Sequence, residues 1–169
     1  WIAAEEINAA GGVLGRPLEV IKRDNRALPA RGINNLRELA ADPDVVAVVC
    51  GKYSPVVVEM LPEIHRLRMP LLDPWAAADS ITDNGYSPNF VFRLSLTDSV
   101  AVRTMLRNAN ARGLSRFGLL LANTEWGRSS LRAARLLLVL HDQQHGRRGG
   151  AADVDRVDER DAQSDAGLG

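Results

Sequence analysis

The apolar residues of this chain fall into short β-branched runs that alternate with longer segments of helical spacing. The run Val45–Val49 is typical of a strand buried on both faces in a parallel sheet. Val58, Leu61 and Ile64 then recur at helical spacing, and Pro70–Leu72 begins a second buried strand. In a parallel sheet, the loops that follow both strands lie at the same carboxyl edge, where ligands bind.

The same alternation covers most of the chain. It predicts further strands at 18–23, 90–94 and 117–121, and helices over residues 1–8, 29–40, about 98–109 and 127–140. Strands that alternate with helices in this way favour an α/β fold with a doubly wound parallel sheet.

Capping residues mark the starts of two of these helices. Ser54 can cap a helix whose first position is Pro55, where the missing N–H costs nothing. Thr97 or Asp98 can cap the helix that follows the 90–94 strand.

Three glycines lie close together at positions 11, 12 and 15. A phosphate-binding loop would follow a strand and open a helix, whereas these glycines follow a helix and precede the 18–23 strand. We therefore predict a turn here and not a nucleotide site.

The two ends of the chain carry weaker signals. Trp1 already lies in helical sequence, with no methionine or signal peptide before it, so we expect that the start of the protein is missing. The lack of a signal peptide in this sequence is therefore not evidence for a cytoplasmic location. Residues 141–169 hold few large aliphatic side chains and no period, which predicts a disordered tail. A second interpretation is that this Arg/Asp/Gly/Ala-rich stretch is translated out of frame.

Composition excludes several classes of function. The 21 basic and 21 acidic residues balance, so no net charge favours nucleic acid or anionic lipid, and no segment is long and apolar enough to span a membrane. Cys50 is the only cysteine, and no metal-ligand spacing, nucleophile elbow or paired carboxylates accompany the histidines at 65, 141 and 145. We predict a protein that is not an enzyme and that uses no metal or cofactor.

Many weakly specific features, in order, resemble the type I periplasmic binding proteins, in particular the leucine/isoleucine/valine-binding branch that serves ABC importers. The most specific is the segment EEINAAGGVLGRPLEVIKRDN. The others are Asp42-Pro43 with the Val-rich run and Gly51, Pro62, Met69-Pro70, Asp79–Thr82, Asn84–Tyr86, Phe92-Arg93 with Asp98, and Arg116–Gly127. The resemblance extends from residue 1 to about 135.

That resemblance implies two lobes that close on a small ligand. Residues 1–94 would form a partial first lobe, 95–140 the hinge crossing and the start of the second lobe, and 141–169 the disordered or out-of-frame tail. The family's first strand would lie between the strands at 18–23 and 45–49 and is not found in this sequence. The chain would thus be an incomplete form of the fold, truncated at both ends.

The implied function is capture of an amino acid or similar small carboxylate in the periplasm or another extracytoplasmic space, for delivery to an ABC permease. Three alternatives remain open. One is a cytoplasmic sensor of the same fold, like the amide-sensing regulators. Another is a flavodoxin-like enzyme domain, and the last is a fragment without function.

The resemblance also names candidate ligand contacts in the loops after the two central strands. Ser54 matches the position whose hydroxyl, with the helix amino end, would hold a carboxylate, and Tyr53 shares its loop. Ala76 would offer a carbonyl to an ammonium group, and Ala77 replaces the usual threonine. The two remaining candidates are aromatic: Trp75 could wall the pocket, and Trp126 matches a ring contributed by the second lobe. Lys52 could also contact the ligand, and Asp73 could pair a cation or form the turn before Pro74.

Overall fold

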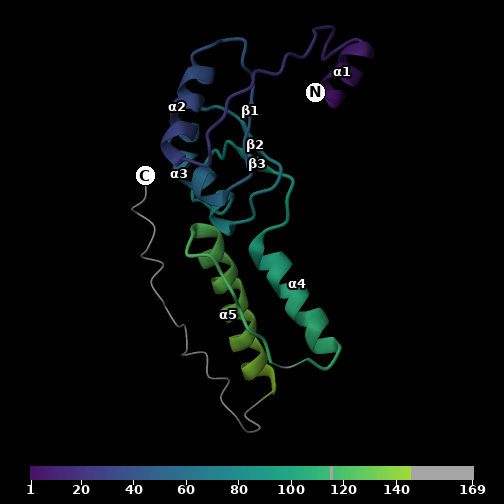
Figure 1. Cartoon of the computed structure of the whole chain (residues 1–169), viewed down its shortest axis with the longest axis vertical. Helices are drawn as coiled ribbons and strands as arrows, with labels where there is room; N and C mark the ends of the chain where they lie inside the picture. Colours follow the sequence, from purple (N-terminus) through teal and green to yellow (C-terminus); the bar gives the residue numbers. More distant parts are fainter. Residues whose placement is uncertain (115, 146–169) are drawn as a thin grey trace, which may run out of the picture.

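The computed structural model describes the backbone of residues 1–114 and 116–145 (Figure 1). In order, the elements are α1 (Ile2–Ala9), α2 (Pro29–Ala40), β1 (Val48–Val49), α3 (Ser54–Leu67), β2 (Leu71–Asp73), the 3-10 turn η1 (Asp79–Ile81), β3 (Val91–Arg93), α4 (Asp98–Ala111) and α5 (Glu125–His145). Between α2 and α4, helices alternate with short strands, as the apolar pattern predicts, whereas α1 and α2, and α4 and α5, follow one another without a strand.

The three strands form a parallel sheet in the order β1-β2-β3. Leu71 pairs with Val48 on one side and with Val91 on the other, so the three side chains lie in one row across the sheet. Helices α2 and α3 pack against each other beside the sheet (Figure 1). The predicted parallel α/β class is confirmed.

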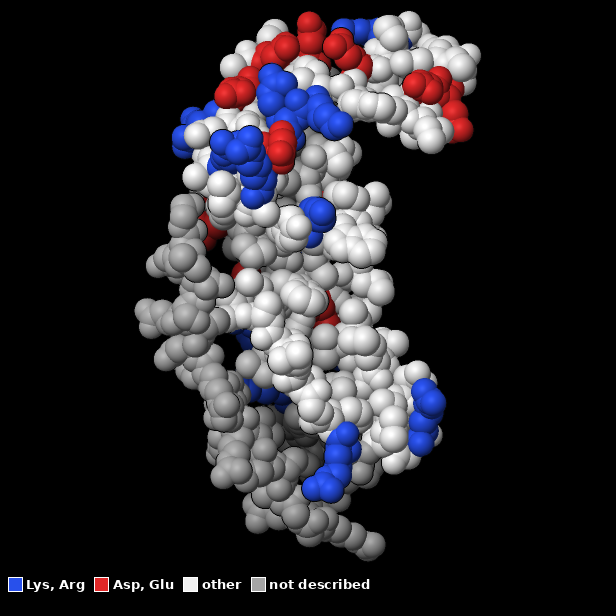
Figure 2. All heavy atoms as spheres, viewed as in Figure 1, with Lys and Arg blue, Asp and Glu red and all other residues white. Residues whose placement is uncertain are grey.

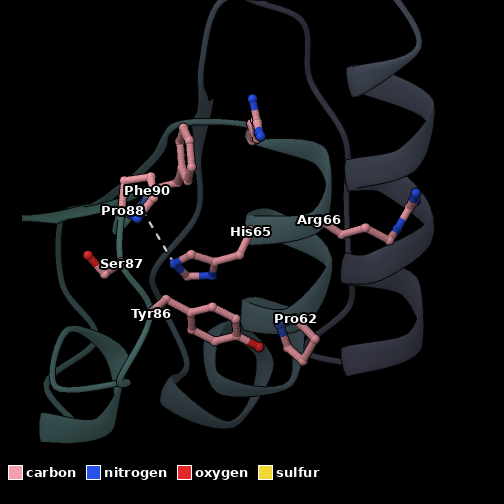
Figure 3. A pocket seen from close by; sticks show the side chains of 8 residues that line it. Pro62, His65, Arg66, Tyr86, Ser87, Pro88 and Phe90 are labelled. Carbon is pink, nitrogen blue, oxygen red and sulfur yellow. Dashed lines mark hydrogen bonds between the residues drawn. The ribbon is translucent and has the colours of Figure 1, made fainter.

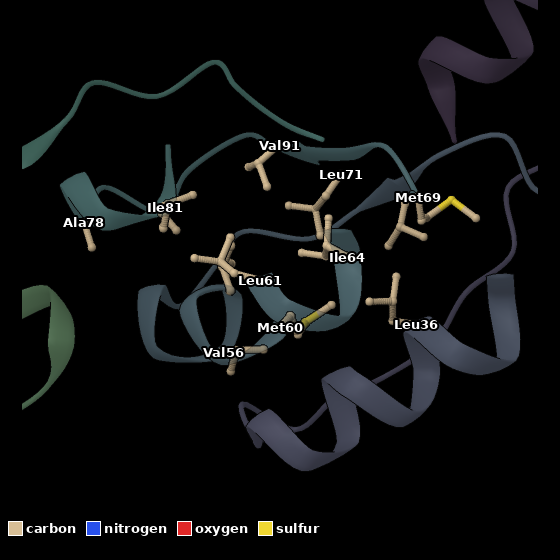
Figure 4. Packing of buried hydrophobic residues seen from close by; sticks show 13 residues of the cluster. Leu36, Val56, Met60, Leu61, Ile64, Met69, Leu71, Ala78, Ile81 and Val91 are labelled. Carbon is tan, nitrogen blue, oxygen red and sulfur yellow. The ribbon is translucent and has the colours of Figure 1, made fainter. Parts of the chain in front are cut away.

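The main core lies between the sheet and these two helices (Figure 4). Leu36 from α2, Met60 and Ile64 from α3, and Leu71 from β2 are each at most 2% exposed. Burying a side chain of this size contributes about 1.5–3 kcal/mol. The helical spacing of apolar residues in α3 therefore predicts its buried face correctly.

The opposite face of the sheet remains open. Val49, Leu72 and Phe92 stand next to one another in register, and they are 69%, 40% and 54% exposed. Residues alternate between the two faces along each strand, so the row beside the core row faces away from it. The described residues leave this apolar row largely uncovered.

Two predicted strands are absent. Among the described residues, 18–23 and 117–121 pair with no strand, and most of their large apolar side chains, such as Ile21 and Leu119, are more than a third exposed. A groove of about 1240 Å³ separates residues 18–23 from β1. It lies where the resemblance implies a further strand. The strand pattern is present in these sequences, but a strand forms only where a partner offers backbone hydrogen bonds.

The caps and turns differ in one detail from the prediction. Thr97 caps α4 by accepting a hydrogen bond from Val100 N, as expected. Tyr53, not Ser54, is the N-cap of α3, because Ser54 already has helical geometry and its hydroxyl contacts another loop. Glycines 11, 12 and 15 all have positive φ and form the predicted turn.

Helices α4 and α5 lie side by side and extend away from the sheet (Figure 1). A small second core of Val102, Ala133 and Ala134 joins them. Helix α5 begins at Glu125, two residues before the predicted start, and continues to His145, past the predicted tail boundary at 141. The rest of the predicted tail, residues 146–169, lies outside the described residues.

Candidate functional site

The loops that follow β1 and β2 meet at the carboxyl edge of the sheet. Gly51 approaches Asp73 so closely that a Cβ atom at position 51 would lie 1.9 Å from Asp73 Oδ1. Only glycine can occupy this position without displacing the carboxylate. The sequence therefore keeps the two loops in direct contact.

The Asp73 side chain fixes the backbone of the loop that follows β2. It is fully buried, and its Oδ1 accepts hydrogen bonds from Trp75 N at 3.1 Å and Ala76 N at 2.9 Å. Burial raises the pKa of the Asp73 carboxyl, and the two backbone donors and nearby Arg93 oppose the rise. Of the two predicted roles, the turn-forming one is observed, while Asp73 Oδ2 is buried and has no hydrogen-bond partner among the described residues.

Ser54 ties the start of α3 to the same loop. Its hydroxyl accepts a hydrogen bond of 3.3 Å from Ala78 N, and the residue is only 4% exposed. This hydroxyl is thus a structural contact between two loops and retains its O–H for donation.

Arg93 holds the second loop from the end of β3. Its Nη2 donates to Ala78 O at 3.0 Å and to Thr82 Oγ1 at 2.6 Å, and its Nη1 donates to Ala76 O at 3.4 Å. Ser95 Oγ donates a second hydrogen bond to Ala76 O at 2.9 Å. The loop conformation is therefore set by donors from β3 and the residues after it.

Asp98 connects this loop to α5. Its backbone N donates to Ala77 O at 2.8 Å, and its Oδ1 accepts from Trp126 Nε1 at 3.2 Å. Close by, Asp79 N donates to the buried Ser129 hydroxyl at 3.1 Å. Burial raises the pKa of Asp98, and the neighbouring hydroxyls and the Trp126 indole oppose the rise. Trp126 therefore belongs to the same edge as the two loops.

The candidate residues separate into a buried group and an exposed group. Ser54 and Ala76 are buried and Ala77 is partly buried, and all three are engaged in hydrogen bonds within the loops. The aromatic candidates Tyr53, Trp75 and Trp126 are 45%, 75% and 47% exposed. The exposed Lys52 lies over the Tyr53 ring, with its Nζ 5.3 Å from the ring centroid.

Sequence analysis missed the residues that hold this edge together. From sequence, Arg93 is singled out only as part of the resemblance, Asp98 only as part of it and as an alternative helix cap, and Ser95 and Ser129 are not singled out. One signal was available: a charged residue directly after a predicted buried strand lies at the carboxyl edge, where a ligand loop can need a clamp.

Charged side chains are unevenly distributed over the face shown in Figure 2. They gather at the end of the molecule that carries α1 and α2, and the middle of this face is mostly uncharged. The uncharged zone lies over the junction between the sheet and helices α4 and α5 (Figures 1 and 2).

A second, shallow hollow lies at the other edge of the sheet, beside the residues that precede β3 (Figure 3). Its central ring, His65, stacks on Tyr86 with the centroids 3.7 Å apart. His65 Nδ1 bonds to Leu61 O at 2.7 Å, and Nε2 lies 3.2 Å from Asn89 Oδ1. Nδ1 thus anchors the imidazole to its own helix, and Nε2 contacts the turn before β3.

The described part of the chain contains no cluster of three or more potential metal ligands. None of its helices combines the length and apolar character needed to cross a membrane.

The family of this chain follows from comparison with known proteins. A family model described as periplasmic binding protein matches residues 2–139. The chain belongs to this family, and its fold is that of the type I periplasmic binding proteins, present in part. A search of curated proteins found no match.

Solved structures of ABC transporter substrate-binding proteins share the fold. One from Desulfitobacterium hafniense, in complex with Leu, is 24% identical with a TM-score of 0.74, over 82% of this chain and 41% of that one. The branched-chain amino acid protein LivJ from Streptococcus pneumoniae, in complex with isoleucine, is 30% identical with a TM-score of 0.52, over 58% and 27%. One from Rhodopseudomonas palustris BisB5, in complex with 3,4-dihydroxybenzoic acid, is 20% identical with a TM-score of 0.70, over 82% and 38%. The chain thus spans less than half the length of these proteins.

Proposed function

We propose that this chain is part of an extracytoplasmic solute-binding protein that captures a small carboxylate, an amino acid or a related acid, for an ABC importer. The observation that carries the proposal is the meeting of three segments at one sheet edge: the start of α3, the loop 74–80 and the start of α5. In an open parallel sheet, this is the edge at which ligands bind.

The electrostatics of this edge favour an anion. Helix α3 has 14 residues, and the positive end of its dipole lies at this edge; within its first turn Pro55 has no N–H, and Val56 N and Val57 N donate to Tyr53 O. The Lys52 ammonium group stands in the same loop, and the carboxylate of Asp73 is buried beneath it. The aromatic rings of Trp75 and Trp126 supply apolar surface for the body of a ligand.

Calorimetric titration of the full chain with a panel of amino acids and simple carboxylic acids tests this proposal. We expect at least one acid to bind, and Lys52→Gln to weaken it by about tenfold through loss of a charge-assisted contact. Lys22→Gln is the matched control, because Lys22 lies far along the chain, beside Trp1. A folded chain that binds no acid at millimolar concentration would contradict the proposal.

A further inference from the structure

The imidazole of His65 meets two groups of opposite hydrogen-bonding character. Its Nε2 atom lies 3.2 Å from Asn89 Oδ1, which can only accept a hydrogen bond. The backbone N–H of Phe90 points at the same Nε2 atom, with 3.4 Å between the two nitrogens (Figure 3). A ring nitrogen donates when it carries a proton and accepts when it does not, so the two contacts exclude each other.

The other ring nitrogen determines which of these contacts is made. Nδ1 lies 2.7 Å from Leu61 O, and a carbonyl oxygen only accepts, so Nδ1 carries a proton. In a neutral imidazole, a proton on Nδ1 leaves a lone pair on Nε2, which accepts from Phe90 N. In the imidazolium both nitrogens carry protons, and Nε2 donates to Asn89 Oδ1. Each charge state of His65 therefore has one complete set of partners.

The two partners of Nε2 belong to the segment that enters β3. Asn89 Oδ1 also accepts from Val91 N at 3.0 Å, so its position is fixed without the imidazole. Phe90 O accepts from Leu71 N at 2.8 Å, where β2 and β3 begin to pair. The charge of one ring thus decides whether α3 contacts a side chain of the turn or the backbone at the start of the ladder.

The charged groups around the ring come from the end of its own helix. Arg66 and Arg68 line the same hollow, and the titratable group from the turn is the phenol of Tyr86, which stacks on the ring. The described residues that line this hollow include no carboxylate. A charged ring is therefore held by the neutral oxygens of Leu61 and Asn89 and by the negative end of the α3 dipole, against the repulsion of two arginines.

We propose that His65 is a proton-dependent switch that exchanges the hydrogen bond between α3 and the turn before β3. With the neutral ring, this bond is made by the backbone N–H of Phe90, and with the charged ring it is made by the side chain of Asn89. Histidine changes charge between about pH 5 and 8, where proteins are commonly most stable, so the exchange takes place in the folded chain. The switch lies at the opposite edge of the sheet from the candidate site and acts without a ligand.

NMR spectroscopy of the isotope-labelled full chain tests the switch. At about pH 8 we expect His65 to carry its proton on Nδ1 alone, and at about pH 5 on both nitrogens. The Phe90 amide resonance should shift with the same midpoint as the ring, because this N–H loses its acceptor when the ring becomes charged. His65→Gln, which does not titrate, identifies the ring signals and should hold the Phe90 amide at one position.

Three results of this experiment would overturn the proposal. They are a neutral ring with its proton on Nε2, a ring that keeps one charge state over this range, and a Phe90 amide that does not follow the ring. The unsubstituted chain decides among them even if His65→Gln does not fold.

A substitution at the acceptor tests the charged state separately. Asn89→Asp places a carboxylate beside Nε2, and an adjacent negative charge favours the imidazolium. We expect the midpoint of the His65 titration to move to higher pH by about one unit or more. Asn110→Asp, at an exposed position on α4, is the matched control and should leave the midpoint unchanged. No shift in Asn89→Asp, or an equal shift in both variants, would show that Asn89 is not the partner of the charged ring and would overturn the exchange.

Discussion

The amide N–H of Ala78 donates a hydrogen bond of 3.3 Å to the hydroxyl oxygen of Ser54, and both residues are buried. This single contact joins the first turn of α3 to the loop that follows β2. The residue expected to bind a ligand carboxylate therefore also fixes the geometry of the loop beside it.

Ser54→Ala leaves the Ala78 N–H without this acceptor. A buried donor that loses its partner costs about 1–3 kcal/mol, so we expect the free energy of unfolding to fall by that amount. Urea denaturation followed by circular dichroism measures it. Ser87→Ala, at an exposed position, is the matched control and should change little. Equal stability of the two variants would show that the contact does not contribute.

Arg93 supports the same loop from the other side. Arg93→Met keeps much of the side-chain volume but removes the donor to Thr82 Oγ1 and one of the two donors to Ala78 O, which keeps only Ile81 N. It also removes the positive charge that faces Asp73, Asp79 and Asp98. We expect a loss of about 3 kcal/mol in unfolding free energy. Arg112→Met, at an exposed position, is the control for loss of an arginine. A loss no larger than that of the control would contradict this role.

The local parts of the fold were predictable because their signals lie within a few residues. Apolar spacing in α3 marks its buried face, and Thr97 marks the start of α4. Residues 18–23 and 117–121 have strand-like sequences, yet the described chain gives them no partner, and sequence propensity alone does not form a ladder.

The site was predictable only in outline. Strand order places the loops after β1 and β2 at one edge, and this much follows from sequence. The engagement of Ala76 O by Ser95 and Arg93 depends on three-dimensional contacts across 17 to 19 residues. No local pattern shows which carbonyl groups remain free.

The buried carboxyl of Asp98 should make stability depend on pH. Its pKa is raised in the folded state, chiefly by burial, so the folded chain binds this proton more tightly than the unfolded chain does. The contribution of Asp98 therefore becomes less favourable as pH rises from the ordinary value of 3.8 through the raised pKa.

Asp98→Asn removes this titration and keeps an oxygen that can accept from Trp126. We expect the stability of the variant relative to the unsubstituted chain to increase between pH 3.8 and pH 7. Urea denaturation at several pH values measures it, with the exposed Asp83→Asn as control. A difference that stays constant with pH would contradict the prediction.

Glu63 should act in the opposite direction. It bonds to Arg37 of α2 and to Arg66 of α3, both at 2.6 Å, and these partners lower its pKa from 4.5 to about 2. Its stabilising contribution is therefore present above pH 4.5 and is lost as the pH falls toward 2.

Glu63→Gln should remove this part of the acid sensitivity. We expect the variant to lose less stability than the unsubstituted chain between pH 4.5 and pH 2, as measured by thermal unfolding. Glu59→Gln, on the exposed side of the same helix, should leave the acid profile unchanged. Identical profiles for Glu63→Gln and the unsubstituted chain would show that the ion pairs do not couple to folding.

The open face of the sheet should promote self-association. Val49, Leu72 and Phe92 form an uninterrupted apolar row, and the edge of β1 borders a groove rather than a strand. Exposed apolar patches and free strand edges both drive contact between copies of the chain.

Phe92→Lys introduces a charge into the apolar row without disturbing the core, because the Phe92 side chain is 54% exposed. We expect sedimentation velocity to show a concentration-dependent increase in mass for the unsubstituted chain and a weaker increase for Phe92→Lys. Leu114→Lys, equally exposed but distant from the sheet, should behave like the unsubstituted chain. If Leu114→Lys reduces association as much as Phe92→Lys does, general charge is responsible and not the apolar row.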